Sequence, residues 1–208
     1  MDIVCLLFDG ITALDIVGPY EVLQRLPDAG VRFVARSKGE IRTDNRFLAL
    51  VADYSLQEVT SADVLVVPGG FATRALENDE PLLEWIRAVD ATTTWTTSVC
   101  TGSMLLAAAG LLAGKEATTH WASLDRLQQY GAIPTGRRVV EQGKFVTAAG
   151  VSAGIDMGLT LAARIAGDEF AQGIQLGIEY DPQPPFDAGS VAKAPPSVVD
   201  FLSARYAD

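Results

Sequence analysis

The 208-residue sequence has few of the residues that several common functional sites require. It holds one histidine, His120, so a metal site built from several histidines cannot form. Its two cysteines, Cys5 and Cys100, are too few for a disulfide framework and favour a reducing, cytoplasmic setting. Basic residues are scarce, since 16 Lys and Arg stand against 26 Asp and Glu, a formal net charge of −10. Nucleic-acid binding needs a positive surface, so this acidity argues against it.

Long apolar runs and targeting signals are also lacking. The longest nearly apolar stretch, residues 104–113, is far shorter than the roughly 20 residues that cross a membrane. Residues 1–4 carry no basic segment ahead of their apolar run, as a secretory signal would. The sequence shows no glycine-rich phosphate-binding loop and no cluster of metal-ligand residues. We therefore expect no cofactor, no metal and no membrane partner.

What the sequence does contain is an alternation of short apolar runs with helical patterns. The runs that predict strands are residues 3–8, 31–35, 47–51, 64–67, 92–99, 139–141 and 145–147. The helical patterns cover residues 14–26, 81–89, 101–112, 121–130, 152–165, 169–178 and 197–205. Strands separated by helices predict an α/β three-layer sandwich, with a mostly parallel central sheet and helices on both faces.

Proline and glycine positions refine this prediction. Pro19 lies near the start of the first helical pattern, where a first turn tolerates proline. The proline-rich segment 182–196 is expected to run over the surface as an ordered excursion. No linker is long enough to divide the chain, and 49% of its residues are hydrophobic, so residues 1–208 are expected to form one domain.

The most informative position is Cys100, where a predicted strand meets a predicted helix. The strand pattern stops at Val99 and a helical pattern begins almost at once, with the small residues Ser98 and Gly102 on either side. This spacing is typical of a nucleophile elbow, whose sharp turn needs small neighbours. N–H groups at a helix start stabilise a thiolate, so we expect a lowered thiol pKa. The alternative is that Cys100 is a small buried hydrophobe, as we expect for Cys5.

Two further strand ends should meet the elbow, because ligands collect at the carboxyl ends of parallel strands. Gly69 and Gly70 end the neighbouring strand, and one of their N–H groups, together with that of Thr101, would form an oxyanion hole. An ordinary glycine turn is the alternative. Asp15 starts the first helix, as its N-cap, as a carboxyl group that exchanges protons with the thiol, or as both, since capping uses one oxygen.

His120 is the only candidate imidazole base. It lies about one strand and one helix beyond the elbow along the chain. That separation favours a hydrogen-bonded structural role over a catalytic one.

Together these residues resemble the ThiJ/PfpI superfamily of flavodoxin-like sandwiches with a reactive cysteine at a strand-to-helix elbow. The resemblance covers nearly the whole chain, through segments 8–10, 14–19, 68–70, 97–103, 108–112, 117–121, 154–156 and 178–180. Segment 179–190 is similar to the branch that hydrates isocyanides. Two positions favour that branch over others. Thr101 stands where peptidase- and chaperone-like relatives typically carry His, and Asp15 where glyoxalase-like relatives typically carry Glu.

The resemblance implies a cofactor-independent enzyme that hydrates an isocyanide, R–N≡C, to an N-substituted formamide. Cys100 would attack the terminal carbon to give an enzyme-bound thioimidate, Asp15 would transfer protons, and Thr101 would assist catalysis. The residues expected to bind the substrate are Gly69, Gly70, Thr101 and Val151. The implied partners are a small apolar isocyanide and, in a homodimer, a second copy of the chain.

Other functions would use the same features. One is a glyoxalase- or deglycase-type activity on reactive dicarbonyls through Cys100. A second is a thiol redox sensor in which Cys100 is oxidised. A third is a small-molecule-binding domain like the amidase-like domain of some AraC-type transcription regulators. Those regulators continue into a basic helix-turn-helix segment, which we do not find before Asp208, and the acidity argues against that branch.

Overall fold

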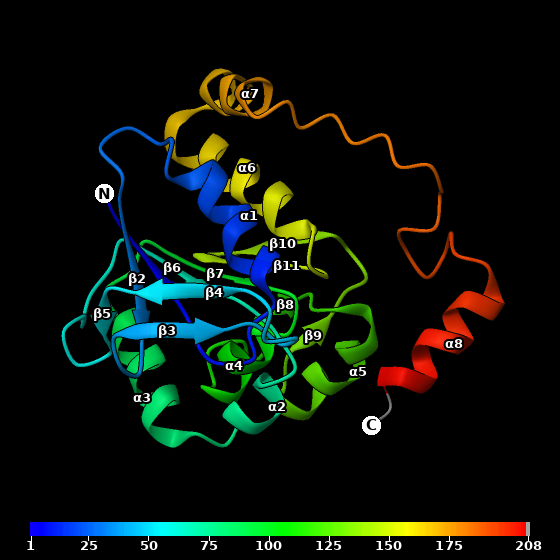
Figure 1. The fold of residues 1–208 in the computed structure, drawn as a ribbon, viewed down its shortest axis with the longest axis horizontal. Coiled ribbons are helices and arrows are strands. Elements are labelled where there is room, and N and C mark those ends of the chain that lie inside the picture. The colour runs from blue at the N-terminus through cyan, green and yellow to red at the C-terminus, as the bar shows by residue number, and fades with distance from the viewer. Residues whose placement is uncertain (207–208) are drawn as a thin grey trace.

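The computed structural model describes residues 1–206 and is drawn in Figure 1. Its centre is a seven-stranded sheet with the strand order β10-β11-β7-β6-β1-β2-β5. These strands are β1 (Asp2–Leu6), β2 (Gly30–Ala35), β5 (Tyr54–Ser55), β6 (Val64–Val67), β7 (Trp95–Val99), β10 (Val139–Gln142) and β11 (Phe145–Ala148). Every neighbouring pair is parallel except β10 and β11, which are antiparallel. The predicted mostly parallel α/β sheet is confirmed.

Helices cover both faces of this sheet (Figure 1). One face carries α1 (Ala13–Leu23), α6 (Ala153–Ala166) and α7 (Asp168–Gly177). The other carries α2 (Thr73–Leu76), α3 (Glu80–Asp90), α4 (Gly102–Ala108) and α5 (Leu124–Leu127). The small pairs β3 (Gly39–Arg42) with β4 (Ala49–Ala52), and β8 (Glu116–Ala117) with β9 (Ile133–Pro134), stand apart from the main sheet.

The central strands form because their apolar side chains are buried on both faces. All four residues of β6 are buried, and so are the last four of β1. A buried Val, Leu or Ile contributes roughly 1.5–3 kcal/mol relative to an exposed one. Continuous apolar runs, rather than alternating ones, are what such doubly covered strands require.

Three helices differ from the predictions. In α1, Pro19 lies inside the helix rather than in its first turn. The Pro19 ring packs against α6, where a Cβ on Gly154 would lie 3.0 Å from it. The helix expected over 101–112 ends at Ala108, since Gly110 takes a positive φ of 80°. The pattern 121–130 folds as α5 flanked by the 3-10 turns Trp121–Ser123 and Gln128–Tyr130, because Ser123 leaves helical geometry with φ −120° and ψ 5°.

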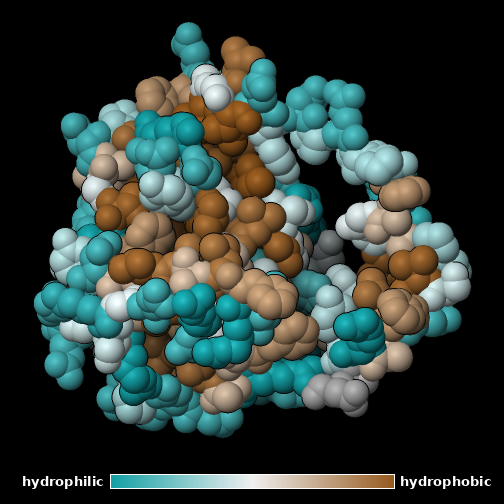
Figure 2. Space-filling model, in the orientation of Figure 1, coloured by the Kyte–Doolittle hydropathy of each residue, from teal (hydrophilic) through white to brown (hydrophobic). Residues whose placement is uncertain are grey.

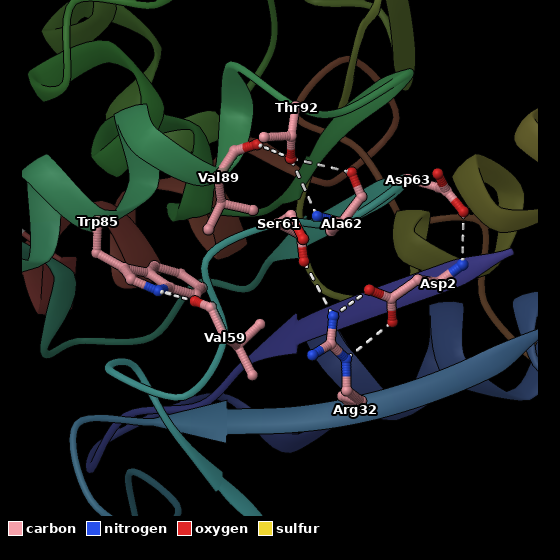
Figure 3. Close-up of polar contacts among 9 residues, drawn as sticks. All are labelled: Asp2, Arg32, Val59, Ser61, Ala62, Asp63, Trp85, Val89 and Thr92. Carbon is pink, nitrogen blue, oxygen red and sulfur yellow. Dashed lines mark hydrogen bonds and ion pairs between the residues drawn. The ribbon is translucent and has the colours of Figure 1, made fainter.

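Polar contacts fasten the amino-terminal edge of the sheet, opposite the elbow (Figure 3). The Asp2 carboxylate accepts from Arg32 Nε at 2.8 Å, and the Asp2 N–H donates to Asp63 Oδ2 at 2.7 Å, which joins β1 to β2 and to the start of β6. Trp85 of α3 donates its indole N–H to the Val59 carbonyl at 2.7 Å. These contacts therefore hold the strands together at their amino-terminal ends, and the opposite, carboxyl ends are where a site can form.

The C-terminal segment leaves this body after α7. Most of residues 179–195 are exposed, as expected for a surface excursion, and they lead to α8 (Pro196–Tyr206), which lies on the side of α5 (Figure 1). Within residues 1–206, no helix combines the length and the apolar character that crossing a membrane requires.

Candidate active site

Cys100 occupies the sharp turn between β7 and α4, as the spacing predicted. Its φ is 56°, a left-handed conformation that costs a non-glycine residue roughly 1–3 kcal/mol. The turn is held by the Cys100 N–H, which donates to the carbonyls of Ala148 and Ala149 at 3.1 and 2.9 Å, and by the Thr119 hydroxyl, which donates to the Cys100 carbonyl at 2.9 Å. A Cβ at Gly102 would lie 2.1 Å from the Val67 carbonyl oxygen, so only glycine fits there. The elbow geometry is confirmed.

Asp15 is fully buried beside this thiol. Its Oδ2 accepts the Gly69 N–H at 2.9 Å, whereas its Oδ1 has no hydrogen-bond partner among residues 1–206. The N-cap of α1 is Thr12, so the N-cap alternative for Asp15 is wrong. The carboxyl group of Asp15 instead reaches the carboxyl ends of the strands, and one of its oxygens is available there.

The surroundings of Asp15 raise its pKa from 3.8 to about 7. Burial is the largest cause, and the charge of Asp44 adds to it. The Gly69 N–H and the Cys100 thiol act in the opposite direction, since both stabilise the carboxylate. The carboxyl group therefore gains and loses a proton within the neutral pH range, as a general acid and base must.

The pKa of the Cys100 thiol is raised to about 12, opposite to the lowering expected for an elbow. Burial is the first cause and the charge of Asp15 the second. The N–H groups of Val151 and Thr101 lower the pKa, but they do not offset desolvation of a residue that is only 6% exposed. The resting thiol is neutral, and it becomes a thiolate only when a neighbouring group accepts its proton.

Gly69 and Gly70 position the other groups. A Cβ at Gly69 would lie 2.8 Å from Asp15 Oδ2 and 2.6 Å from the Thr101 nitrogen, so glycine lets these residues approach. The Gly70 N–H donates to the Thr101 hydroxyl at 3.0 Å. Both glycine N–H groups are thus bound to side chains, Asp15 and Thr101, which they hold in place.

The site opens into a cavity of about 190 Å³ that includes Cys100 in its wall. The residues around it are Thr12, Asp44, Gly70, Phe71, Thr73, Arg74, Cys100, Thr101, His120, Ala122, Ser123, Val151 and Tyr206. The fold thus brings together Cys100, Thr101, Gly70 and Val151 at the cavity, with Asp15 and Gly69 directly behind them. Among residues 1–206, no group of three or more His, Cys, Asp and Glu side chains is placed to hold a metal ion.

His120 does reach the cavity, although it lies far from the elbow in sequence. Its Nδ1 accepts the Ala122 N–H at 3.4 Å, and burial lowers its pKa, so the ring is neutral. A Cβ on Gly150 would lie 2.8 Å from this ring, which shows how closely the ring is packed. His120 is a wall residue with a structural hydrogen bond, in agreement with its expected role.

Two aromatic wall residues are absent from the sequence-based predictions. Phe71 directly follows Gly69 and Gly70, so its nearness to a strand end was a usable signal. Tyr206 comes from α8, and no local pattern connects it with residues a hundred positions earlier.

This arrangement suits addition to a small, uncharged electrophile. A neutral thiol and a titratable carboxyl group face each other in a largely desolvated site, with the N–H groups of Thr101 and Val151 beside the sulfur. The thiol supplies a nucleophile and the carboxyl group moves its proton.

Comparison with known proteins agrees with the geometry. The DJ-1/PfpI family model matches residues 1–164. Isonitrile hydratase from Pseudomonas putida is 46% identical over 97% of this chain and 88% of its own length. The crystal structure of a ThiJ/PfpI family protein from Pseudomonas syringae has a TM-score of 0.96 and 39% identity, and covers 99% of this chain and 86% of that one.

A helix-turn-helix transcriptional regulator from Pseudomonas aeruginosa is more distant. It is 34% identical over 127 residues, which are 60% of this chain and 37% of the regulator. The family match covers most of the chain and includes Asp15, Gly69, Cys100 and Val151. This chain belongs to the DJ-1/PfpI family.

Proposed function

We propose that this protein is an isocyanide hydratase, which converts R–N≡C and water to the formamide R–NH–CHO. The observation that carries the proposal is the neutral Cys100 thiol facing the titratable Asp15 carboxyl group at the wall of a small cavity. The similarity to the isonitrile hydratase of Pseudomonas putida supports the choice of substrate.

The first step adds the thiol S–H across the isocyanide carbon. The Asp15 carboxylate accepts the thiol proton while sulfur bonds to the terminal carbon, and the same proton then passes to that carbon. The product is the thioimidate R–N=CH–S–Cys100, with no net change in charge. Isocyanide carbon is unusual because it needs both a nucleophile and a proton. We assign this transfer to Asp15 Oδ1, which has no hydrogen-bond partner within residues 1–206.

The second step releases the product. Asp15 accepts a proton from water as the water oxygen bonds to the thioimidate carbon, and the nitrogen gains a proton. The resulting R–NH–CH(OH)–S–Cys100 loses its carbon–sulfur bond to give R–NH–CHO. The proton from the hydroxyl returns to sulfur, so the thiol and the carboxylate are restored. One carboxyl group serves both steps, and neither needs an imidazole.

The remaining site residues keep this pair in position. The N–H groups of Thr101 and Val151 lower the pKa of the thiol and stabilise sulfur as its negative charge develops. Thr101 is fixed by the Gly70 N–H, and Asp15 by the Gly69 N–H. The hydroxyl of Thr101 lies at the cavity, where we assign it to orienting substrate or water.

Two observations support our choice of this function over a dicarbonyl enzyme and a redox sensor. A dicarbonyl substrate develops an oxyanion, but the N–H groups of Gly69 and Gly70 already bind Asp15 and Thr101. A redox sensor needs a thiolate, whereas the pKa of Cys100 is raised to about 12.

We also propose that the enzyme is a cytoplasmic homodimer. Large apolar side chains on α7, the following segment and α8 are exposed: Leu176 by 79%, Phe186 by 77% and Phe201 by 62%. Figure 2 shows apolar side chains gathered on α8 and over the region of α1 and α6. Sedimentation velocity should give about twice the 22.1 kDa mass of one chain, and a monomer at micromolar concentration would contradict the proposal.

The two cysteines provide a matched test of the nucleophile. Purified protein should convert phenyl isocyanide to N-phenylformamide, measured by liquid chromatography. Cys100→Ala should reduce the rate to that of buffer alone, because the bond-forming atom is lost. Cys5→Ala removes a thiol buried within β1 and should keep the wild-type kcat within about twofold. Full activity in Cys100→Ala, or none in the wild type, would refute the proposed mechanism.

The rate should depend on pH through Asp15. The reactive free enzyme holds one proton on the Cys100–Asp15 pair, so protonation of the carboxylate below its pKa of about 7 removes the base. We expect kcat/KM to fall tenfold per pH unit below that value and to be level from pH 8 to 10. Asp15→Asn should reduce the rate about 10²–10⁴-fold, and its kcat/KM should no longer fall below pH 7. A profile without an inflection between pH 6 and 8 would contradict the role of Asp15.

Asp15 should also lower the stability of the fold at high pH. Its pKa is 3.8 when exposed and about 7 when folded, so ionisation favours the unfolded chain once pH rises above 3.8. Asp15→Asn should raise the free energy of unfolding by about 2 kcal/mol at pH 5 and about 4 kcal/mol at pH 8. Urea titration measures both values.

The exposed residue Asp53 provides the control for this stability test. Asp53→Asn should change the free energy of unfolding by less than about 0.5 kcal/mol at either pH. If Asp15→Asn destabilises the protein, or if its gain in free energy of unfolding does not grow with pH, then the fold does not raise the pKa of the Asp15 carboxyl group.

A further inference from the structure

The C-terminal helix contacts the body of the protein at the candidate active site. No residue of α8 is buried, and Val198 and Phe201 are exposed. The aromatic contacts between α8 and the rest of residues 1–206 involve Tyr206. The Tyr206 carbonyl also accepts a hydrogen bond from Arg74 at 2.7 Å. An extended segment of the chain leads from α7 to α8 (Figure 1), and Tyr206 at the end of α8 lines the cavity.

Tyr206 completes an aromatic wall, formed with Phe71 and His120, around the cavity that contains Cys100. Its ring lies nearly parallel to that of Phe71, with centroids 6.2 Å apart and planes 25° apart. It meets His120 edge-on, with a centroid distance of 5.1 Å. Trp121 supports Tyr206 from outside the cavity at 5.7 Å. Aromatic faces and edges of this kind bind flat apolar rings.

The wall lies where the R group of a substrate would extend. The reacting carbon must approach Cys100, and the cavity from there to Tyr206 has a volume of about 190 Å³. A dry cavity of about 150 Å³ accommodates benzene, so this one has room for a single aromatic ring. The His120 ring is neutral, and Arg74 is already bonded to the Tyr206 carbonyl.

We propose that Tyr206 is a specificity-determining residue that selects isocyanides whose R group is one aromatic ring. This inference rests on the proposed hydratase function. Tyr206 acts on the ring and not on the reacting carbon, so its effect should be on KM rather than on kcat. Within residues 1–206 the Tyr206 side chain makes its contacts through the ring, so we expect the hydroxyl group to be dispensable.

Steady-state kinetics with phenyl isocyanide and methyl isocyanide test this proposal. Tyr206→Ala should raise KM for phenyl isocyanide at least tenfold and change kcat less than twofold, while KM for methyl isocyanide changes less than twofold. Tyr206→Phe should restore the wild-type values. Ser203→Ala, at an exposed position of the same helix that does not line the cavity, should change KM for neither substrate. Equal effects of Tyr206→Ala on both substrates, or no effect, would overturn the proposal.

A binding measurement separates this inference from the proposed reaction. Phenylacetylene has the linear shape of phenyl isocyanide, and it can be titrated calorimetrically into Cys100→Ala and into the Cys100→Ala, Tyr206→Ala double variant. The second substitution should raise Kd about tenfold. If the wild type hydrates no isocyanide but this Kd still changes, the role of Tyr206 in binding the ring is supported and the proposed reaction is refuted. If the wild type is active but Tyr206→Ala changes neither KM nor Kd, the proposed reaction is supported and the role of Tyr206 in specificity is refuted.

Discussion

The candidate site depends on one contact, that between the Asp15 carboxyl group and the Cys100 thiol. In water at neutral pH the carboxyl group is ionised and the thiol is neutral, and burial makes the charged form of either group costly. The two groups therefore share protons more readily than they ionise independently. Three separate parts of the fold hold this contact. The elbow positions the sulfur, the first turn of α1 positions the carboxyl group, and Gly69 leaves room for that carboxyl group beside Thr101.

The sheet explains why these parts meet. β1, β6 and β7 are adjacent and parallel, so the segments that follow them emerge at the same edge. Gly102 and Gly69 stand where any Cβ would collide with a neighbouring backbone. Close backbone approach, more than side-chain packing, sets the geometry here. The amino-terminal edge carries the ion pair of Asp2 with Arg32, which secures the strands without occupying the site.

Much of this was predictable from the sequence, because strand order and elbow geometry leave local patterns. Apolar runs marked the strands, and small residues around Cys100 marked the turn. The direction of the thiol pKa was not predictable, since Cys100 is buried against Ala153 and Met157 of α6, which meet it only in the folded chain. The ends of α4 and α5 were also misplaced, because Gly110 and Ser123 change the backbone locally. Tyr206 left no signal, since a contact across a hundred residues has no local pattern.

A neutral thiol is chemically consistent with the proposed substrate. A permanent thiolate would react with peroxides and other electrophiles, whereas a thiol that ionises only by giving its proton to Asp15 stays protected until substrate arrives. An isocyanide carbon accepts both sulfur and proton, so the reaction uses the pair as a unit and leaves no isolated charge in the buried site. The feature that weakens Cys100 as a free nucleophile is thus the one that matches it to an isocyanide.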